Sequence, residues 1–129
     1  MIPRRLVAAF DGDRDRLGER IATTYLELWD DPETGRILQS MVRTAMTSER
    51  SASLLREVLA GRILANLPDD VRVGDEVSLR VLLCGTHLLG IAIARNIVGI
   101  EPVAGMDREH IVELVAPTIQ RYLTGLAPR

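Results

Sequence analysis

Hydrophobic positions in the first half of this chain recur every three or four residues, which is the spacing of one face of an α-helix. The first such segment spans residues 14–29 and ends where Asp31 can cap a second helix that has Pro32 at its first position. The second helix is predicted to continue to about residue 46. A third is predicted from residue 47 or 48 to near 67, before a proline and two aspartates.

Two further helices are predicted in the second half, at about 74–98 and 107–123. Beyond Arg80 the first of them is apolar nearly all round, so we expect it to be the central helix, covered on more than one side. One of its faces has the heptad spacing of two closely packed helices. That face consists of Ser78, Leu82, Gly85, Leu89, Ala92 and Asn96. The other face is mixed, and we expect it to look into the interior; it consists of Arg80, Cys84, His87, Ile91 and Arg95.

The last predicted helix repeats the heptad spacing at Val112, Val115, Ile119 and Tyr122. It also contains Pro117, which removes one backbone hydrogen bond and is expected to bend or weaken the helix locally. No internal repeat, linker or low-complexity tract interrupts the chain. We therefore predict an all-α fold in which about five helices form a single antiparallel, bundle-like domain over residues 1–129.

Composition and charge narrow the range of functions. One Phe, one Trp and two Tyr are the only aromatic residues, so aliphatic side chains and Met must build the core, and this palette suits helices. The net charge is −2, and the sixteen positive charges, all of them Arg, are spread along the chain, which argues against a nucleic-acid surface within it. No motif assembles a nucleophile, a base and an orienting group, so we predict neither an enzyme nor a cofactor site.

The single cysteine, Cys84, cannot form a disulfide within the chain, which fits a reducing cytoplasm. Cys84 and His87 are close enough in sequence to share a metal ion, but there is no second Cys/His pair, so we predict no metal site. We interpret them as a packed cysteine and a histidine that bonds internally or lines a pocket. Arg95 and Glu101 are interpreted as structural caps or ion-pair partners at the end of a helix.

A membrane protein is not predicted. The longest uncharged stretch, residues 81–94, is shorter than the roughly twenty residues that span a bilayer. The first residues also lack the apolar run of a signal peptide, so we expect a cytoplasmic protein.

Six segments of the chain resemble a known family in their order and spacing. They are LGER at 17–20, LWDDPE at 28–33, MVRTA at 41–45, LGIAIAR at 89–95, EPVA at 101–104 and VAPTIQRYLTG at 115–125. Together they resemble the C-terminal domain of actinobacterial-type tetracycline-repressor (TetR) family transcription regulators. The resemblance covers about residues 6–125 and implies a homodimeric repressor whose last two long helices pair with those of a second copy.

The resemblance also implies that the preceding helices enclose a pocket for a small hydrophobic effector. The candidate pocket residues are Tyr25, Trp29, Met41, Ala45, Leu59, Cys84, His87, Leu88 and Ile91. For each of them taken alone, ordinary core packing is the simpler interpretation. The residues expected at the dimer interface are Leu82, Gly85, Leu89, Ala92, Asn96, Val112, Val115, Ile119 and Tyr122.

The chain departs from the family at its N-terminus, where the family carries a helix-turn-helix domain that reads DNA. Residues 1–10 are too few for that module and are expected to be at most the tail of the connecting helix. We expect DNA contact only through this missing domain, and truncation is the favoured explanation. The alternative is a naturally short protein that forms heterodimers with a complete regulator and so blocks it.

Overall fold

A computed structural model of the chain describes residues 2–57 and 76–124. Its α-helices are α1 (Ile2–Ala8), α2 (Leu17–Asp30), α3 (Pro32–Thr47), α4 (Glu49–Glu57), α5 (Val77–Ala92) and α6 (Arg108–Thr124). Short 3-10 turns form η1 (Arg14–Arg16) and η5 (Val103–Gly105), and α5 continues as a π-helical segment, η4 (Ile93–Val98). The predicted all-α class is confirmed, with α1 as an additional helix. The predicted end of the third helix, 58–67, lies outside the described residues.

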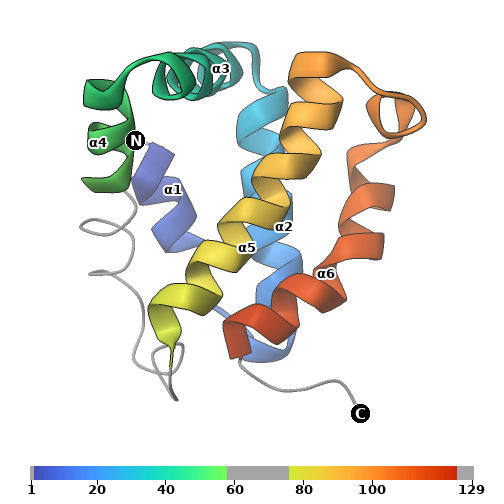
Figure 1. The fold of residues 1–129 in the computed structure, drawn as a ribbon. Helices are drawn as coiled ribbons and strands as arrows, with labels where there is room; N and C mark the ends of the chain where they lie inside the picture. The colour runs from blue at the N-terminus through green and yellow to red at the C-terminus, as the bar shows by residue number, and fades with distance from the viewer. Residues whose placement is uncertain (1, 58–75, 125–129) are drawn as a thin grey trace.

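Helix α2 is the centre of the arrangement. It contacts α6 most extensively and also packs against α1, α3 and α5, and seven of its fourteen residues are buried. In Figure 1, α5 crosses in front of α2, α6 lies beside them, and α3 runs across one end. Within one chain α2, and not the predicted α5, is therefore the central helix, and Leu79, Leu82 and Leu83 on α5 are exposed.

Local capping explains where the first helices begin. The Asp13 carboxylate accepts a hydrogen bond from the backbone N–H of Asp15 and starts η1. Asp31 caps α3 by accepting from the backbone N–H groups of Glu33 and Thr34, at 2.9 and 3.3 Å, with Pro32 in the first turn. This is the arrangement that the sequence predicts, and it satisfies donors that no helical carbonyl can reach.

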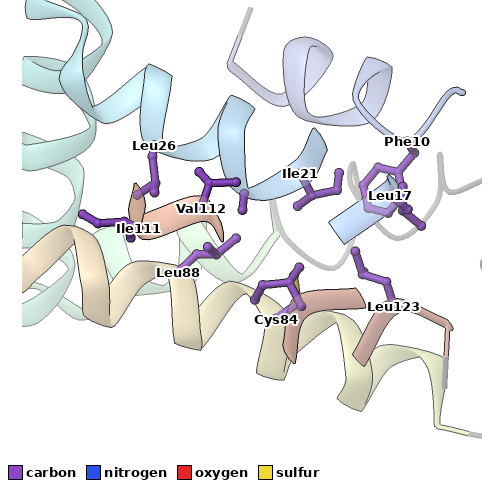
Figure 2. Packing of buried hydrophobic residues seen from close by; sticks show 11 residues of the cluster. Phe10, Leu17, Ile21, Leu26, Cys84, Leu88, Ile111, Val112 and Leu123 are labelled. Atoms are coloured by element: carbon purple, nitrogen blue, oxygen red, sulfur yellow. The ribbon is translucent and has the colours of Figure 1, made fainter. Parts of the chain in front are cut away.

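The hydrophobic core lies between α2, α5 and α6, and Figure 2 shows how its side chains meet. Its buried members are Phe10, Leu17, Ile21, Ala22, Leu26, Cys84, Leu88, Ile111, Val112, Ile119 and Leu123. Cys84 and Leu88 lie four residues apart, so they share the side of α5 that faces this core. Cys84 is thus the packed cysteine that the sequence predicts.

The closest approach of α2 to α6 is at Gly18. A Cβ atom placed there would lie 2.6 Å from the backbone oxygen of Ala116 and 2.6 Å from the backbone nitrogen of Gln120. The Gln120 side chain also accepts a hydrogen bond from the Gly18 N–H at 2.6 Å and donates to the Arg14 carbonyl oxygen at 2.7 Å. Only glycine allows this contact, and Gln120 fixes the start of α2 against α6. Pro117 lies inside α6, as predicted.

Helix α5 and η4 together make Leu79–Val98 long and apolar enough to cross a membrane by length and composition alone. The longest uncharged stretch, residues 81–94, is shorter than this helix, because the helix continues past Arg80 and Arg95. Both of its arginines are held inside the domain, since Arg80 donates to the carbonyl oxygens of Tyr122 and Leu123 and Arg95 donates to Asp30. We interpret it as a core helix of a soluble domain that also has an apolar outer face.

We predict that Gly18→Ala lowers the free energy of unfolding by about 2 kcal/mol, because the new methyl group forces two helix backbones apart. Gly85→Ala is the matched control: no atom lies within 4 Å of a Cβ placed there, so the better helix propensity of Ala should raise the free energy by about 0.5–1 kcal/mol. Urea unfolding followed by circular dichroism, at one protein concentration, measures both. Equal effects of the two changes would show that the α2–α6 contact is not tight.

Candidate functional site

An apolar groove opens on the outer side of α5, between α5, η5 and α6. Its volume is about 410 Å³, and it is lined by Leu83, Thr86, His87, Gly90, Ile91, Ala94, Val103 and Tyr122. No side chain in this lining is a carboxylate or a guanidinium. The groove can therefore accept apolar side chains at little electrostatic cost.

Four leucines on α5 and α6 are exposed, and one of them, Leu83, lines the groove. Leu82 on α5 is 56% exposed and Leu114 on α6 is 62% exposed, and Leu79 and Leu83 on α5 are also exposed. We call these four residues together with the groove the α5/α6 face. Exposed apolar side chains on neighbouring helices often mark a site of contact with another molecule.

Aromatic residues connect α5 to α6 within this face. The rings of His87 and Tyr122 lie with their centroids 5.2 Å apart at an angle of 35°. The Arg121 guanidinium lies 5.8 Å from the centre of the Tyr122 ring, within range of a cation–π interaction. His87 therefore belongs to the outer face of α5.

A second group of side chains lies on the inner side of α2. Trp29 is only 4% exposed. Tyr25 lies four residues earlier and neighbours both Trp29 and Cys84. Burial raises the pKa of the Tyr25 hydroxyl to about 12, although a hydrogen bond from the Trp29 side chain acts to lower it. Burial also raises the pKa of the Cys84 thiol to about 12. Both groups are therefore uncharged at neutral pH.

A polar cluster at the end of α2 ties three elements together. Both carboxylate oxygens of Asp30 lie 2.8 Å from Nη1 of Arg95, and Asn96 Nδ2 donates to Asp30 at 3.0 Å. Arg108, at the start of α6, pairs with Asp30 at 3.3 Å. Arg95 also donates to the Met106 carbonyl oxygen. The Asp30 cluster therefore joins α2, η4 and α6 at one end of the domain.

Comparison with known proteins shows which family has this arrangement. The family model described as "Tetracyclin repressor-like, C-terminal domain" matches residues 15–123. The chain belongs to the TetR family. A solved TetR-family regulator from Streptomyces coelicolor A3 is similar in structure, with a TM-score of 0.68 and 27% sequence identity over 95% of this chain and 81% of that one. No curated protein sequence matches the chain.

This TetR C-terminal domain is a regulator domain and not an enzyme. Its Cys84 and His87 do not face a common site, since the thiol lies in the core and the imidazole lines the outer groove. Among residues 2–57 and 76–124, no group of three or more His, Cys, Asp or Glu side chains could hold a metal ion. Arg95 and Glu101 have the structural roles that the sequence predicts: Arg95 pairs with Asp30, and Glu101 accepts from the Gly105 N–H.

The two faces predicted for α5 of this TetR domain are found only in part: Arg80, Cys84 and Arg95 are turned inward as expected, whereas His87 lines the groove. Ala92, Val112 and Ile119 were expected at the interface, but they are buried within one chain and cannot reach another. Asn96 is occupied by its bond to Asp30. Of the other interface candidates, Leu82 is exposed, Tyr122 lines the groove, and Gly85, Leu89 and Val115 are partly buried.

The residues predicted to line one pocket do not lie together in the structure. Tyr25, Trp29 and Cys84 lie together inside, and Leu88 is part of the core. His87 and Ile91 line the outer groove instead of the interior, because α5 is turned with Cys84 and Leu88 inward. On α3, Met41 is exposed and Ala45 is partly buried. Leu59 lies outside the described residues.

The Asp30 cluster depends on pH. Partial burial acts to raise the pKa of the Asp30 carboxyl, but the hydrogen bonds from Asn96 and Arg95 and the charge of Arg95 outweigh it, so the pKa is lowered. A carboxyl whose pKa is lower in the folded state stabilises the fold fully at pH values above its unfolded-state pKa, which is about 3.9 for Asp. This stabilisation is lost as the pH falls through the lower folded-state pKa.

We predict that Asp30→Asn lowers the free energy of unfolding by about 1–2 kcal/mol at pH 7, because it leaves Arg95 without its partner; the pair is 22% and 13% exposed, which limits the effect. The difference from the parent protein should shrink below about pH 4. Urea unfolding at pH 7 and pH 3 measures it. The exposed Asp11→Asn is the control and should change little at either pH. A difference that stays constant with pH would contradict a charge-based role.

Proposed function

We propose that this chain is the effector-sensing and homodimerisation domain of a cytoplasmic TetR-family repressor, and that a small molecule bound within it relieves operator binding by the full-length protein. The observation that carries the proposal is the α5/α6 face, which is apolar and exposed on a domain whose core is complete without it. DNA contact belongs to the helix-turn-helix domain that the family carries before this one.

A second copy of the chain is the occupant that suits this face best. The face is formed by two neighbouring helices, so a two-fold axis through it places the same two helices of each copy against each other. Leu82 and Leu114 would then lose their exposed apolar surface to the other copy. His87 is the only acidic or basic side chain between Arg80 and Arg95, and no Asp, Glu, Lys or Arg occurs there, so pairing brings few charges together along the middle of α5.

The effector part of the proposal rests on the inner side of α2. Tyr25 and Trp29 are polar-tipped aromatic side chains in a buried place, which is the usual lining of a small-molecule site. Trp29 immediately precedes Asp30, which pairs with Arg95 of η4 and Arg108 of α6. A ligand that shifts the end of α2 would therefore act on η4, which follows α5, and on the first residue of α6.

We predict that the protein is a dimer of twice the 14.3 kDa chain mass, and that the dimer persists on dilution. Leu82→Glu and Leu114→Glu should each give monomers, because a buried carboxylate in an apolar interface is strongly unfavourable. Multi-angle light scattering over a dilution series measures the mass.

The control is Met46→Glu, which changes a 76% exposed apolar residue on α3, away from the proposed interface. It should leave the dimer mass unchanged, and circular dichroism should show that all variants keep their helical content. A clean monomer for the parent protein would overturn the homodimer and favour a fragment that binds a different chain.

A further inference from the structure

His87 lies in the middle of the apolar outer side of α5. It is exposed and lines the groove together with Leu83, four residues before it, and Gly90, three residues after it. Residues at these spacings share one side of a helix. A second copy that covers the α5/α6 face therefore covers His87 as well and removes water from its imidazole.

Positive charge already surrounds the ring that His87 contacts. The Arg121 guanidinium lies 5.8 Å from the centre of the Tyr122 ring, and Arg80 donates to the Tyr122 carbonyl oxygen at 3.1 Å. None of the residues that line the groove is an aspartate or a glutamate. A protonated His87 would thus be a third positive group around Tyr122, without a carboxylate in the groove to balance it.

The titratable groups of α2 and η4 do not balance a charge on His87 either. Tyr25 of α2 lies beside Cys84, which is turned into the core. Arg95 of η4 is paired with Asp30. These groups therefore leave the charge state of His87 to be decided on the outer side of α5.

The carboxylates of the remaining elements around the groove are engaged or remote. The 3-10 turn η5 has none, and Glu101, just before it, accepts a hydrogen bond from the Gly105 N–H. Helix α6 carries Glu109 and Glu113, and the nearer of them precedes Tyr122 by nine residues, which is about 13 Å along a helix axis. An imidazolium at position 87 would have to be covered without a close counter-charge.

Histidine is the side chain that ordinarily changes its charge between about pH 5 and pH 8. A neutral imidazole can be covered by apolar side chains at modest cost, whereas a cation that loses water and gains no partner is strongly disfavoured. The separated chain keeps His87 in water and accepts the proton freely. Protonation therefore favours the separated chains, and its loss favours the dimer.

We infer that the proposed dimer is pH-sensitive and that His87 is the residue through which protonation weakens it. This inference rests on the proposed homodimerisation and names its regulation. The second copy binds while both copies of His87 are neutral. As the pH falls and His87 gains a proton, the two copies separate.

Light scattering over a dilution series at about pH 8 and about pH 5.5 tests this. A histidine with the ordinary pKa of about 6.5 is about tenfold more often protonated than neutral at the lower pH. Because a dimer contains two copies of His87, we expect its dissociation constant to rise about ten- to hundredfold between the two conditions. The lowered pKa of Asp30 keeps that carboxyl ionised at both pH values, so the Asp30 cluster stays intact.

Three variants isolate the group. His87→Gln should form a dimer of nearly equal strength at both pH values, and His87→Arg, which is always charged, should be monomeric at both. His110→Gln is the matched control: it removes the only other histidine, which is exposed on α6 with Glu109 and Glu113 near it in sequence, and should respond to pH like the parent protein. Circular dichroism at both pH values verifies that the helices persist.

Equally tight dimers of the parent protein at both pH values would overturn the inference and leave the homodimer in place. Dissociation of His87→Gln at pH 5.5, or its failure to form a dimer at pH 8, would contradict the role given to His87, as would a dimer of His87→Arg. A parent protein that is monomeric even at pH 8 would overturn the proposed homodimerisation, and this inference with it.

Discussion

The tight contact of α2 with α6 is the constraint on which the rest of this structure depends. At one end Gly18 lets the two backbones meet, and Gln120 spans them with two hydrogen bonds. At the other end Asp30 binds Arg108 at the start of α6 and Arg95 in η4, which continues α5. With both ends held, the apolar side chains between them have a fixed register, and α5 has to lie across the pair.

This position gives α5 two unequal sides. Cys84 and Leu88 complete the core, while Leu83, His87 and Gly90 face the groove on the other side. Residues on an α-helix are about 100° apart, so positions that differ by one or three residues can belong to different faces. An almost wholly apolar helix in a domain of this size thus supplies both the core and a surface suited to a partner.

Local signals in the sequence predicted the helices well. The Asp31–Pro32 start of α3 and the bounds of α2 and α6 follow from capping and periodicity, which act over a few residues. Some interface candidates on the heptad seams were misplaced because heptad spacing shows that a seam packs tightly but does not show whether its partner is in the same chain. Ala92 illustrates this: it is small and on the seam, yet it is buried within its own domain.

The Asp30 cluster was only half predicted, for a similar reason. Arg95 was expected to have a structural partner, but that partner lies 65 residues away, and no local pattern indicates which carboxylate it is. In the proposed function, the cluster links the inner side of α2 to the outer face, because Trp29 and Asp30 are consecutive and Asp30 holds η4 and α6. Coupling between a ligand and the proposed interface would then need no long pathway, because one helix end carries both the side chain proposed to meet the ligand and the tie to these helices.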